Sequence, residues 1–252
     1  MLTVEALTKS YGDMVAISRI DFTVKAGEFV CIVGPSGCGK TTLLKCVAGL
    51  LAPSGGKVVL HGREVVEPPR QMALVFQDYS RSLLPWMSVH SNVALPLHRR
   101  NLSGEEQRTL VADALASVGL EGFDRHYPWQ LSGGMQQRVA MARALAYQPE
   151  ILLMDEPFAS VDAQTRSDLE DLLLSVWRRL KITVLFVTHD IDESVYLADR
   201  VVVLGPRPTT VDEILAVGLP RPRDQVSTKE LPEFAHLRAH IYTAIKRTPT
   251  TS

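Results

Sequence analysis

The amino-acid sequence predicts an α/β fold that carries an inserted, all-helical subdomain. Two continuous apolar runs, at residues 151–154 and 183–187, are typical of central strands in a parallel sheet that is buried on both faces. Residues 78–147 contain few β-branched runs and show helical spacing instead. Strand–helix–strand alternation around such an insertion is the pattern of an α/β domain.

The first third of the chain predicts strands separated by glycine-containing turns. The expected strands are the short apolar or β-branched runs at residues 2–6, 20–24, 29–33, 57–60 and 73–76. Turns at residues 12–13 and 25–27 separate the first three strands. Residues 41–50 then have helical spacing, and Gly49 and Pro53 mark the end of that helix.

The remaining elements are mostly helices. Helices are expected at residues 105–118, 135–147, 164–180 and 233–246, and a last strand at residues 200–204. The elements predict a core at residues 1–77 and 148–205, a helical subdomain at residues 78–147, and a C-terminal extension at residues 206–252. The core begins with the antiparallel strands of an N-terminal β subdomain.

Composition excludes several classes of protein. The 252 residues are 46% hydrophobic and 22% charged, which is close to the average for folded proteins and excludes a disordered or fibrous chain. Lys and Arg number 27 against 28 Asp and Glu, so no global field favours nucleic acid. A DNA-binding protein with its charge gathered on one face stays compatible with these numbers.

Cysteines and apolar segments bear on the compartment. Cys31, Cys38 and Cys46 suit neither a disulfide framework nor a CxxC metal site, which favours a reducing compartment. The N-terminal residues lack the basic and apolar regions of a secretory signal. Since no stretch approaches the roughly 20 apolar residues of a membrane span, we expect an intracellular chain that does not itself cross a membrane.

A glycine-rich loop follows the third predicted strand. Gly34-Pro-Ser-Gly-Cys-Gly39-Lys40-Thr41 fits G-x-x-x-x-G-K-[ST] between a predicted strand and a predicted helix. In this pattern backbone N–H groups and the helix start bind phosphate oxygens, the lysine reaches the β- and γ-phosphates, and the threonine binds Mg²⁺. The candidate nucleotide ligands are Gly34, Pro35, Ser36, Gly37, Cys38, Gly39, Lys40, Thr41 and Thr42. By itself the motif also fits a turn that only joins strand to helix.

Two carboxylates follow the apolar run at residues 151–154. Asp155 and Glu156 stand at the carboxyl end of that strand, where ligands bind in an open α/β sheet. Asp155 is a candidate Mg²⁺ ligand, directly or through water, and Glu156 is a candidate to polarise the attacking water. Alone, the pattern would also fit an ordinary strand end, but together with the phosphate loop it favours nucleotide hydrolysis.

A second anion-binding helix start is predicted at Leu131-Ser132-Gly133-Gly134-Met135-Gln-Gln-Arg138. Read by itself, Ser132 with two glycines is either a capped helix start or a phosphate site. The octapeptide resembles the signature motif of ATP-binding cassette (ABC) ATPases. The resemblance implies a P-loop NTPase (RecA-like) core and two subunits paired head to tail. Each ATP then lies between the phosphate loop of one chain and residues 132–134 of the other.

The resemblance covers most of residues 1–205 and implies further site residues. In the family's pattern Gln77 senses Mg²⁺ and the attacking water, His189 hydrogen-bonds the γ-phosphate, and Asp162 lies at the dimer seam. Tyr11 fits the aromatic residue that stacks on adenine, with packing as the alternative. Two residues depart from the family's pattern without removing a phosphate ligand: Met135 replaces Gln and Val161 replaces Leu.

The segment after Gln77 places large apolar side chains in a connection. Residues 78–87 include Leu84 and Trp86, and an exposed apolar group of this kind marks a partner site. In ABC transporters this region holds a groove for the coupling helix of the membrane subunit, and the alternative is a loop folded onto its own subdomain. Four features resemble the nitrate, sulfonate and taurine importers: the Leu-Leu-Pro-Trp segment, the LSGGM form of the signature, residues 206–208 and the tail at residues 219–224.

The resemblance implies a peripheral ATPase subunit of such an importer, at the cytoplasmic face of the inner membrane. It implies ATP and Mg²⁺ as cofactors, a homodimer in the ATP-bound state, integral membrane permease subunits, an indirect extracytoplasmic solute-binding protein, and no nucleic acid. Two rivals stay open, namely a soluble ABC ATPase without a permease and a P-loop kinase, which has no use for the signature. The solute, the permease, the oligomeric state without ATP and the role of the tail are not specified by the sequence.

Overall fold

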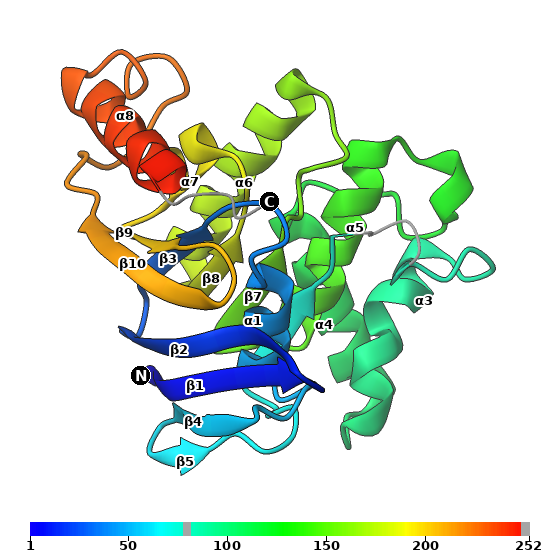
Figure 1. The fold of residues 1–252 in the computed structure, drawn as a ribbon. Helices are drawn as coiled ribbons and strands as arrows, with labels where there is room; N and C mark the ends of the chain where they lie inside the picture. The colour runs from blue at the N-terminus through cyan, green and yellow to red at the C-terminus, as the bar shows by residue number, and fades with distance from the viewer. Residues whose placement is uncertain (78–81, 248–252) are drawn as a thin grey trace. The chain divides into compact units, whose positions relative to one another are not determined.

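The computed structural model describes residues 1–77 and 82–247, and the chain divides into two compact units. The first unit is formed by residues 1–69 together with the chain from residue 182 onward, and the second by residues 70–181. Each unit has strands and helices of its own, most of which Figure 1 labels.

The first unit begins with an antiparallel β subdomain. β1 (Leu2–Tyr11) pairs with β2 (Met14–Val24) and with β4 (Gly55–Leu60), and β4 pairs with the short β5 (Arg63–Glu64). The predicted subdomain is therefore confirmed. β1 and β2 extend further than predicted towards their shared turn, where Tyr11, Met14 and Val15 are exposed.

Buried parallel strands form the centre of the first unit. β3 (Phe29–Val33) lies between β9 (Arg200–Leu204) and β8 (Thr183–Val187) and runs parallel to both. All five residues of β3 are buried. α1 (Lys40–Val47) follows β3 and ends earlier than predicted. Within this unit the strand order is β5-β4-β1-β2-β10-β9-β3-β8.

A strand of the C-terminal extension joins the outer strands of the first unit to the central ones. β10 (Thr209–Ala216) runs antiparallel to β9 and parallel to β2. The prediction that residues 200–204 form the last strand is therefore wrong. β10 was missed because solvent-facing positions alternate along it, it contains two acidic residues, and prolines precede it.

Two helices pack against each other in this unit, α7 (Ile191–Leu197) next to β3 and α8 (Pro232–Arg247) next to β9. α7 was not predicted, because seven residues are too few for a clear periodic pattern. α8 agrees with the predicted terminal helix and packs on α7 and β9. Its buried side chains include Phe234, Leu237 and Ile241. Figure 1 shows α8, in red, next to α7.

The second unit combines two parallel strands with the inserted helices. β6 (Met72–Val75) and β7 (Ile151–Asp155) pair in parallel. The helices are α3 (Val89–Ala94), η1 (Leu95–Arg99), α4 (Gly104–Ser117), η2 (Pro128–Gln130), α5 (Gly133–Ala146) and α6 (Ala163–Leu180). α3, α4 and α5 pack against one another, and α5 also contacts β6 and α6. The predicted helical insertion is thus confirmed.

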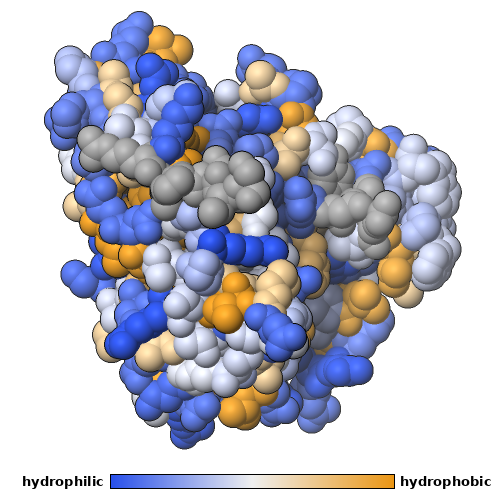
Figure 2. Space-filling model, in the orientation of Figure 1, coloured by the Kyte–Doolittle hydropathy of each residue, from blue (hydrophilic) through white to orange (hydrophobic). Residues whose placement is uncertain are grey.

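The surface of the chain is mixed in polarity. Figure 2 shows hydrophilic residues interspersed with apolar ones over β1, β2 and β4, as is usual for folded proteins. The exposed aromatic side chains include Tyr11, Trp86 and Trp129. None of the helices in the described part of the chain is long and apolar enough to cross a membrane.

Candidate functional site

The phosphate loop forms the turn from β3 to α1 in the first unit. Gly39, just before α1, has a φ of 105°, in the left-handed region that favours glycine. The Lys40 side chain is buried, and its Nζ donates hydrogen bonds to the carbonyl oxygens of Gly34 at 2.9 Å and of Pro35 at 3.1 Å. The loop is therefore wrapped around the ammonium group of its own lysine.

The outer part of the phosphate loop faces solvent. Ser36, Gly37 and Thr41 are exposed, and Thr42 is half-buried. Gly37 has a φ of 74° and no atom within 4 Å of the place where a Cβ would stand. The loop thus combines a buried lysine with an open outer surface.

Contacts from β9 and β10 hold the other side of the phosphate loop. A Cβ on Gly34 would lie 2.9 Å from the carbonyl oxygen of Leu204, so glycine is required for this close approach. Cys38 is buried, and this burial raises the pKa of its thiol. The hydroxyl of Thr209, itself fully buried, donates to the carbonyl oxygen of Cys38. Sequence reasoning missed Thr209 because the strand that carries it was not predicted.

Tyr11 ends β1 at the hairpin turn to β2. Its side chain is 47% exposed, and the Lys9 ammonium lies 5.3 Å from the centre of its ring. Met14, across the turn, is also exposed, and its sulfur lies 3.8 Å from Nη1 of Arg207. The Tyr11 ring therefore lies at the surface of the first unit.

His189 stands between β8 and α7. The chain leaves β8 through Thr188, whose N–H donates to the carbonyl oxygen of Ile32 in β3 at 3.1 Å, and His189 itself is exposed. Asp190 then caps α7, and its carboxylate accepts from the Glu193 N–H at 3.2 Å. The place of His189 is consequently set by the end of β8 and the start of α7.

In the second unit, Asp155 ends β7 and Glu156 follows it. Asp155 is buried, whereas Glu156 is half-buried and has a φ of 43°. A residue other than glycine carries about 1–2 kcal/mol of backbone strain in this left-handed region. Nε2 of Gln77, which is exposed after β6, donates to Oε2 of Glu156 at 3.5 Å, the long end of the hydrogen-bond range. The structure thus brings together two predicted site residues, Gln77 and Glu156.

The signature residues form the start of α5. Ser132 is the N-cap, and its hydroxyl accepts from the Met135 N–H at 3.3 Å. Ser132 and Gly133 are exposed, so the first turn of this 14-residue helix is open to solvent. Its N–H groups and the helix dipole make such a start favourable for an anion.

Asp162 caps α6, whose first turn touches the start of α5. The Asp162 carboxylate accepts from the hydroxyl of Thr165 at 2.7 Å and from its N–H at 3.0 Å, and these hydrogen bonds lower the pKa of Asp162. A Cβ on Gly134 would lie 2.5 Å from Cγ2 of Thr165. Gly134 is therefore required for the close approach of the two helix starts, which the motif alone did not reveal.

The chain between β6 and α3 presents Trp86, whose side chain is 69% exposed. Asn92 of α3, fully buried, holds the loop in shape, because its Oδ1 accepts from the Leu84 N–H at 2.8 Å. Nδ2 of Asn92 donates at 3.1 Å to the carbonyl oxygens of Leu84, Met87 and Ser88. Sequence reasoning singled out Trp86 as a large apolar residue but did not find Asn92, which gives the loop its shape.

The same segment is tied to the signature helix. Arg143, near the end of α5, donates to the carbonyl oxygen of Ser82 at 2.6 Å and to its hydroxyl at 2.8 Å. Both contacts lie within the second unit, so the helix that begins at Ser132 is anchored to the loop that presents Trp86. Residues 78–81 of the predicted partner segment lie outside the described residues.

Known proteins are similar in sequence to this chain over nearly its whole length. The family model for the ABC transporter matches residues 17–159. An uncharacterized ABC transporter ATP-binding protein of Methanocaldococcus jannaschii is 49% identical over 249 residues, which are 97% of this chain and 91% of that protein. The nitrate import ATP-binding protein of Synechococcus elongatus is 46% identical over 230 residues, 90% of this chain and 83% of that protein.

An import protein for another solute and a solved structure agree with these matches. The aliphatic sulfonates import ATP-binding protein of Bacillus licheniformis is 44% identical over 236 residues, 94% of this chain and 89% of that protein. A dimeric ATP-binding cassette in a post-hydrolysis state, bound to ADP and Pi, superposes with a TM-score of 0.75 at 35% identity, covering 86% of this chain and 99% of that chain. With the phosphate loop, the paired Gln77 and Glu156 and the signature helix in place, the chain belongs to the ABC transporter family, as an ATP-binding, ATP-hydrolysing subunit.

Proposed function

We propose that the chain is the ATPase subunit of an importer, and that it couples ATP binding at a dimer seam to uptake of a small solute through separate membrane subunits. The observation that carries this proposal is the occurrence in one chain of two phosphate-binding features, the loop around Lys40 and the exposed start of α5 at Ser132. One nucleotide needs only one such loop, so the second has a use when each ATP is shared by two chains. The dimeric form of the related cassette supports this arrangement.

The phosphate loop is the proposed site for the β- and γ-phosphates. Lys40 exchanges its bonds to the carbonyls of Gly34 and Pro35 for stronger bonds to phosphate oxygens, in which both donor and acceptor are charged. The N–H groups of residues 36–42, which include the start of α1, supply further donors. Tyr11 stacks on adenine in this proposal, and His189 donates a hydrogen bond to the γ-phosphate.

The donor set proposed for Mg²⁺ fits that ion. Thr41, Gln77 and Asp155 offer a hydroxyl, an amide and a carboxylate oxygen, and Mg²⁺ takes such oxygen ligands together with phosphates and waters. Across residues 1–77 and 82–247 no group of three or more His, Cys, Asp or Glu side chains is placed to hold a metal ion. Bound Mg²⁺ would neutralise the charge that develops on the phosphate oxygens.

Glu156 is the proposed base that directs water at the γ-phosphate. Its left-handed backbone supports the role, because strain of this kind is retained where the local geometry serves a function. Gln77 donates to the Glu156 carboxylate and so holds the oxygen that would accept the proton from water. Lys40 and His189 stabilise the charge of the transition state.

The proposed cycle follows from binding linkage. ATP bound to one chain contacts Ser132, Gly133 and Gly134 of the other, so ATP in both sites favours a closed dimer with Asp162 at the seam. Hydrolysis removes the contact between the γ-phosphate and the signature, and the dimer reopens. Because Arg143 anchors the signature helix to the loop that presents Trp86, movement of α5 moves that loop.

The loop that presents Trp86 is the proposed contact with the permease. An exposed tryptophan on a loop that makes four hydrogen bonds with Asn92, three donated by its Nδ2 and one accepted by its Oδ1, is a preformed apolar contact. The nitrate and sulfonate import proteins among its relatives support a small anionic solute. In this proposal the chain is attached to the cytoplasmic face of the inner membrane, and an extracytoplasmic solute-binding protein delivers the solute.

Steady-state ATPase assays of Glu156→Gln test the catalytic assignment. Replacing a general base is expected to lower kcat at least about 100-fold while ATP still binds. Glu121→Gln is the matched control, because Glu121 is exposed on the turn after α4 and is none of the proposed site residues. Turnover of Glu156→Gln close to that of the control would exclude Glu156 as the base.

Affinity purification from detergent-solubilised membranes of the native host tests the importer assignment. The tagged chain is expected to bring down an integral membrane protein, and Trp86→Glu is expected to lose it while retaining ATP binding. If the wild-type chain is recovered without any membrane protein, the alternative of a soluble ABC ATPase is favoured. The ATPase assignment survives that result.

A further inference from the structure

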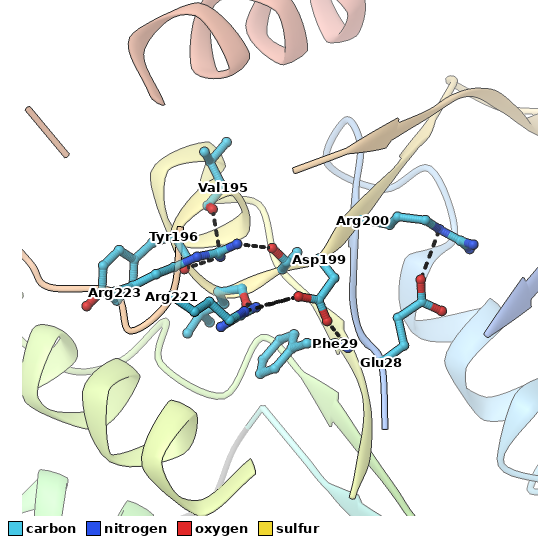
Figure 3. A network of polar contacts seen from close by, with 10 residues as sticks. Glu28, Phe29, Val195, Tyr196, Asp199, Arg200, Arg221 and Arg223 are labelled. Carbon is cyan, nitrogen blue, oxygen red and sulfur yellow. Dashed lines mark hydrogen bonds and ion pairs between the residues drawn. The ribbon is translucent and has the colours of Figure 1, made fainter. Parts of the chain in front are cut away.

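Two arginines of the C-terminal extension close the end of α7 (Figure 3). Arg223 donates to the carbonyl oxygens of Val195 at 3.2 Å, Tyr196 at 2.5 Å and Ala198 at 2.7 Å. The last carbonyls of a helix have no partners within the helix, and cationic donors there are favoured by the helix dipole. The side chain of Arg223 thus supplies the C-terminal cap of a helix that lies far away in sequence.

Arg221 connects the same helix end to β3. Its Nη2 donates to the carbonyl oxygen of Leu197 at 3.0 Å and to Oδ1 of Asp199 at 2.7 Å, and its Nε also reaches Oδ1 at 3.1 Å. Oδ2 of Asp199 accepts from the N–H of Phe29, the first residue of β3, at 2.9 Å. One carboxylate therefore bridges the extension, the end of α7 and the strand that leads into the phosphate loop.

The C-terminal extension also contacts the start and the middle of α7. Arg238 of α8 lies 3.6 Å from the carboxylate of Asp192 in the first turn, although this pair is about half exposed and contributes little energy. The Lys229 ammonium lies 5.0 Å from the ring centre of Tyr196. Phe234 and Ile241, both buried, lie on α8, which packs on α7. Residues of the C-terminal extension therefore contact the first turn, the middle and the end of α7.

These contacts matter because α7 is too short to hold its own geometry. A helix of seven residues is not stable in isolation, so its position is set by what packs on it and caps it. Burial lowers the pKa of Arg223 to about 10, so the guanidinium is still charged at neutral pH. His189 is followed directly by Asp190, the N-cap of α7. A shift of α7 is therefore transmitted to His189 through one residue.

We infer that Arg221 and Arg223 are positioning residues for His189, and that the C-terminal extension acts on ATP hydrolysis by fixing α7. This inference rests on the proposed role of His189 at the γ-phosphate. Neither arginine touches nucleotide in this account. Their contribution is to hold the helix that follows the histidine, and loss of either cap leaves His189 displaced or mobile in the closed dimer.

A double-mutant cycle between Arg223→Gln and His189→Ala tests the inference. Misplacement of a catalytic group by about 1 Å costs up to about 100-fold in rate, so Arg223→Gln is expected to lower kcat at least about tenfold with the KM for ATP changed less than about twofold. In the His189→Ala background, the same substitution is expected to lower the residual kcat by less than about twofold, because the residue it positions is gone. Arg223→Lys, which retains a cationic donor, is expected to recover part of the activity.

Two further variants keep the test decisive. Ile20→Val trims a buried side chain of β2, in the antiparallel β subdomain, and its kcat is expected to equal that of the wild type. If Arg223→Gln does not fold, Arg221→Lys, which keeps the charge facing Asp199, takes its place in the cycle.

The outcomes separate the two claims. A His189→Ala chain with full activity overturns the proposed role of the histidine, and this inference with it. A His189→Ala chain that is impaired, combined with an arginine effect equally large in both backgrounds, overturns the inference alone. Loss of kcat in Ile20→Val as large as that in Arg223→Gln also overturns it, because stability alone would then explain the effect.

Discussion

Replacing Gly134 by alanine tests whether the signature glycine has a packing role in addition to any contact with phosphate. The new Cβ would lie 2.5 Å from Cγ2 of Thr165, well inside van der Waals contact. Thr165 cannot simply rotate away, since its hydroxyl donates to the Asp162 carboxylate at 2.7 Å. Either the two helix starts must separate or this hydrogen bond must break.

The expected magnitude combines two opposing effects. Alanine in place of glycine near the start of a helix is favourable by up to about 1 kcal/mol, whereas overpacking costs typically about 1–3 kcal/mol. We therefore expect Gly134→Ala to lower the free energy of unfolding by about 1–2 kcal/mol. Gly104→Ala is the matched control, because Gly104 also starts a helix and has no atom within 4 Å of its added Cβ. That variant is expected to be as stable as the wild type or slightly more stable.

Urea unfolding of four chains measures the effect. Thr165→Ser removes Cγ2 and keeps the hydroxyl, so it is expected to restore most of the lost stability in the Gly134→Ala chain. ATPase turnover of the double variant then reports whether the glycine also serves the nucleotide. The reasoning is refuted if Gly134→Ala is as stable as Gly104→Ala, or if Thr165→Ser fails to recover stability in the double variant.

Three other expectations follow from single contacts. Asn92→Leu leaves the Leu84 N–H without its acceptor inside the fold. The free energy of unfolding, measured with urea, is therefore expected to fall by about 2–4 kcal/mol. Thr209→Val removes the bond to the Cys38 carbonyl and is expected to weaken ADP binding in calorimetry several-fold, whereas Thr209→Ser, which retains the hydroxyl, should bind like the wild type. Hydrogen bonds to Thr165 lower the pKa of Asp162 in the folded state. The Asp162 carboxylate therefore stabilises the fold at pH values above its unfolded pKa of 3.8, and this stabilisation is lost as the pH falls through the folded pKa. The stability difference between wild type and Asp162→Ala should accordingly shrink from pH 6 to pH 3, and a difference that does not change with pH would contradict the assignment.

Most of the buried elements could be predicted from the sequence, because burial on both faces leaves a continuous apolar run. β3, β7 and β8 are of this kind. The helices α4 and α6 could be predicted from their apolar residues at helical spacing. β10 could not be predicted, since its exposed positions alternate, its two acidic residues are consecutive and prolines precede it, a combination typical of a loop. Its place between β2 and β9 depends on pairing between residues almost 200 positions apart, which no local pattern records.

The candidate site was predicted residue by residue, but its internal contacts were not. A motif places Gln77 and Glu156 at strand ends, whereas only the structure shows that they share a hydrogen bond and that the glutamate backbone is left-handed. The same holds for Thr209 and Arg223, whose partners are backbone carbonyls. Every residue has a backbone carbonyl, so the residue type at the acceptor position does not reveal such a contact in the sequence.

The most direct test of the shared-nucleotide account is the mass of the Glu156→Gln chain in solution, measured by light scattering with ATP or with ADP. The account predicts a dimer, about twice the 27.8 kDa of one chain, with ATP and a monomer with ADP. Adding Ser132→Phe at the start of α5 should return the ATP-bound chain to a monomer that still binds nucleotide. A mass that ATP does not change, or a dimer that survives the Ser132 substitution, would contradict the claim that two chains share each ATP.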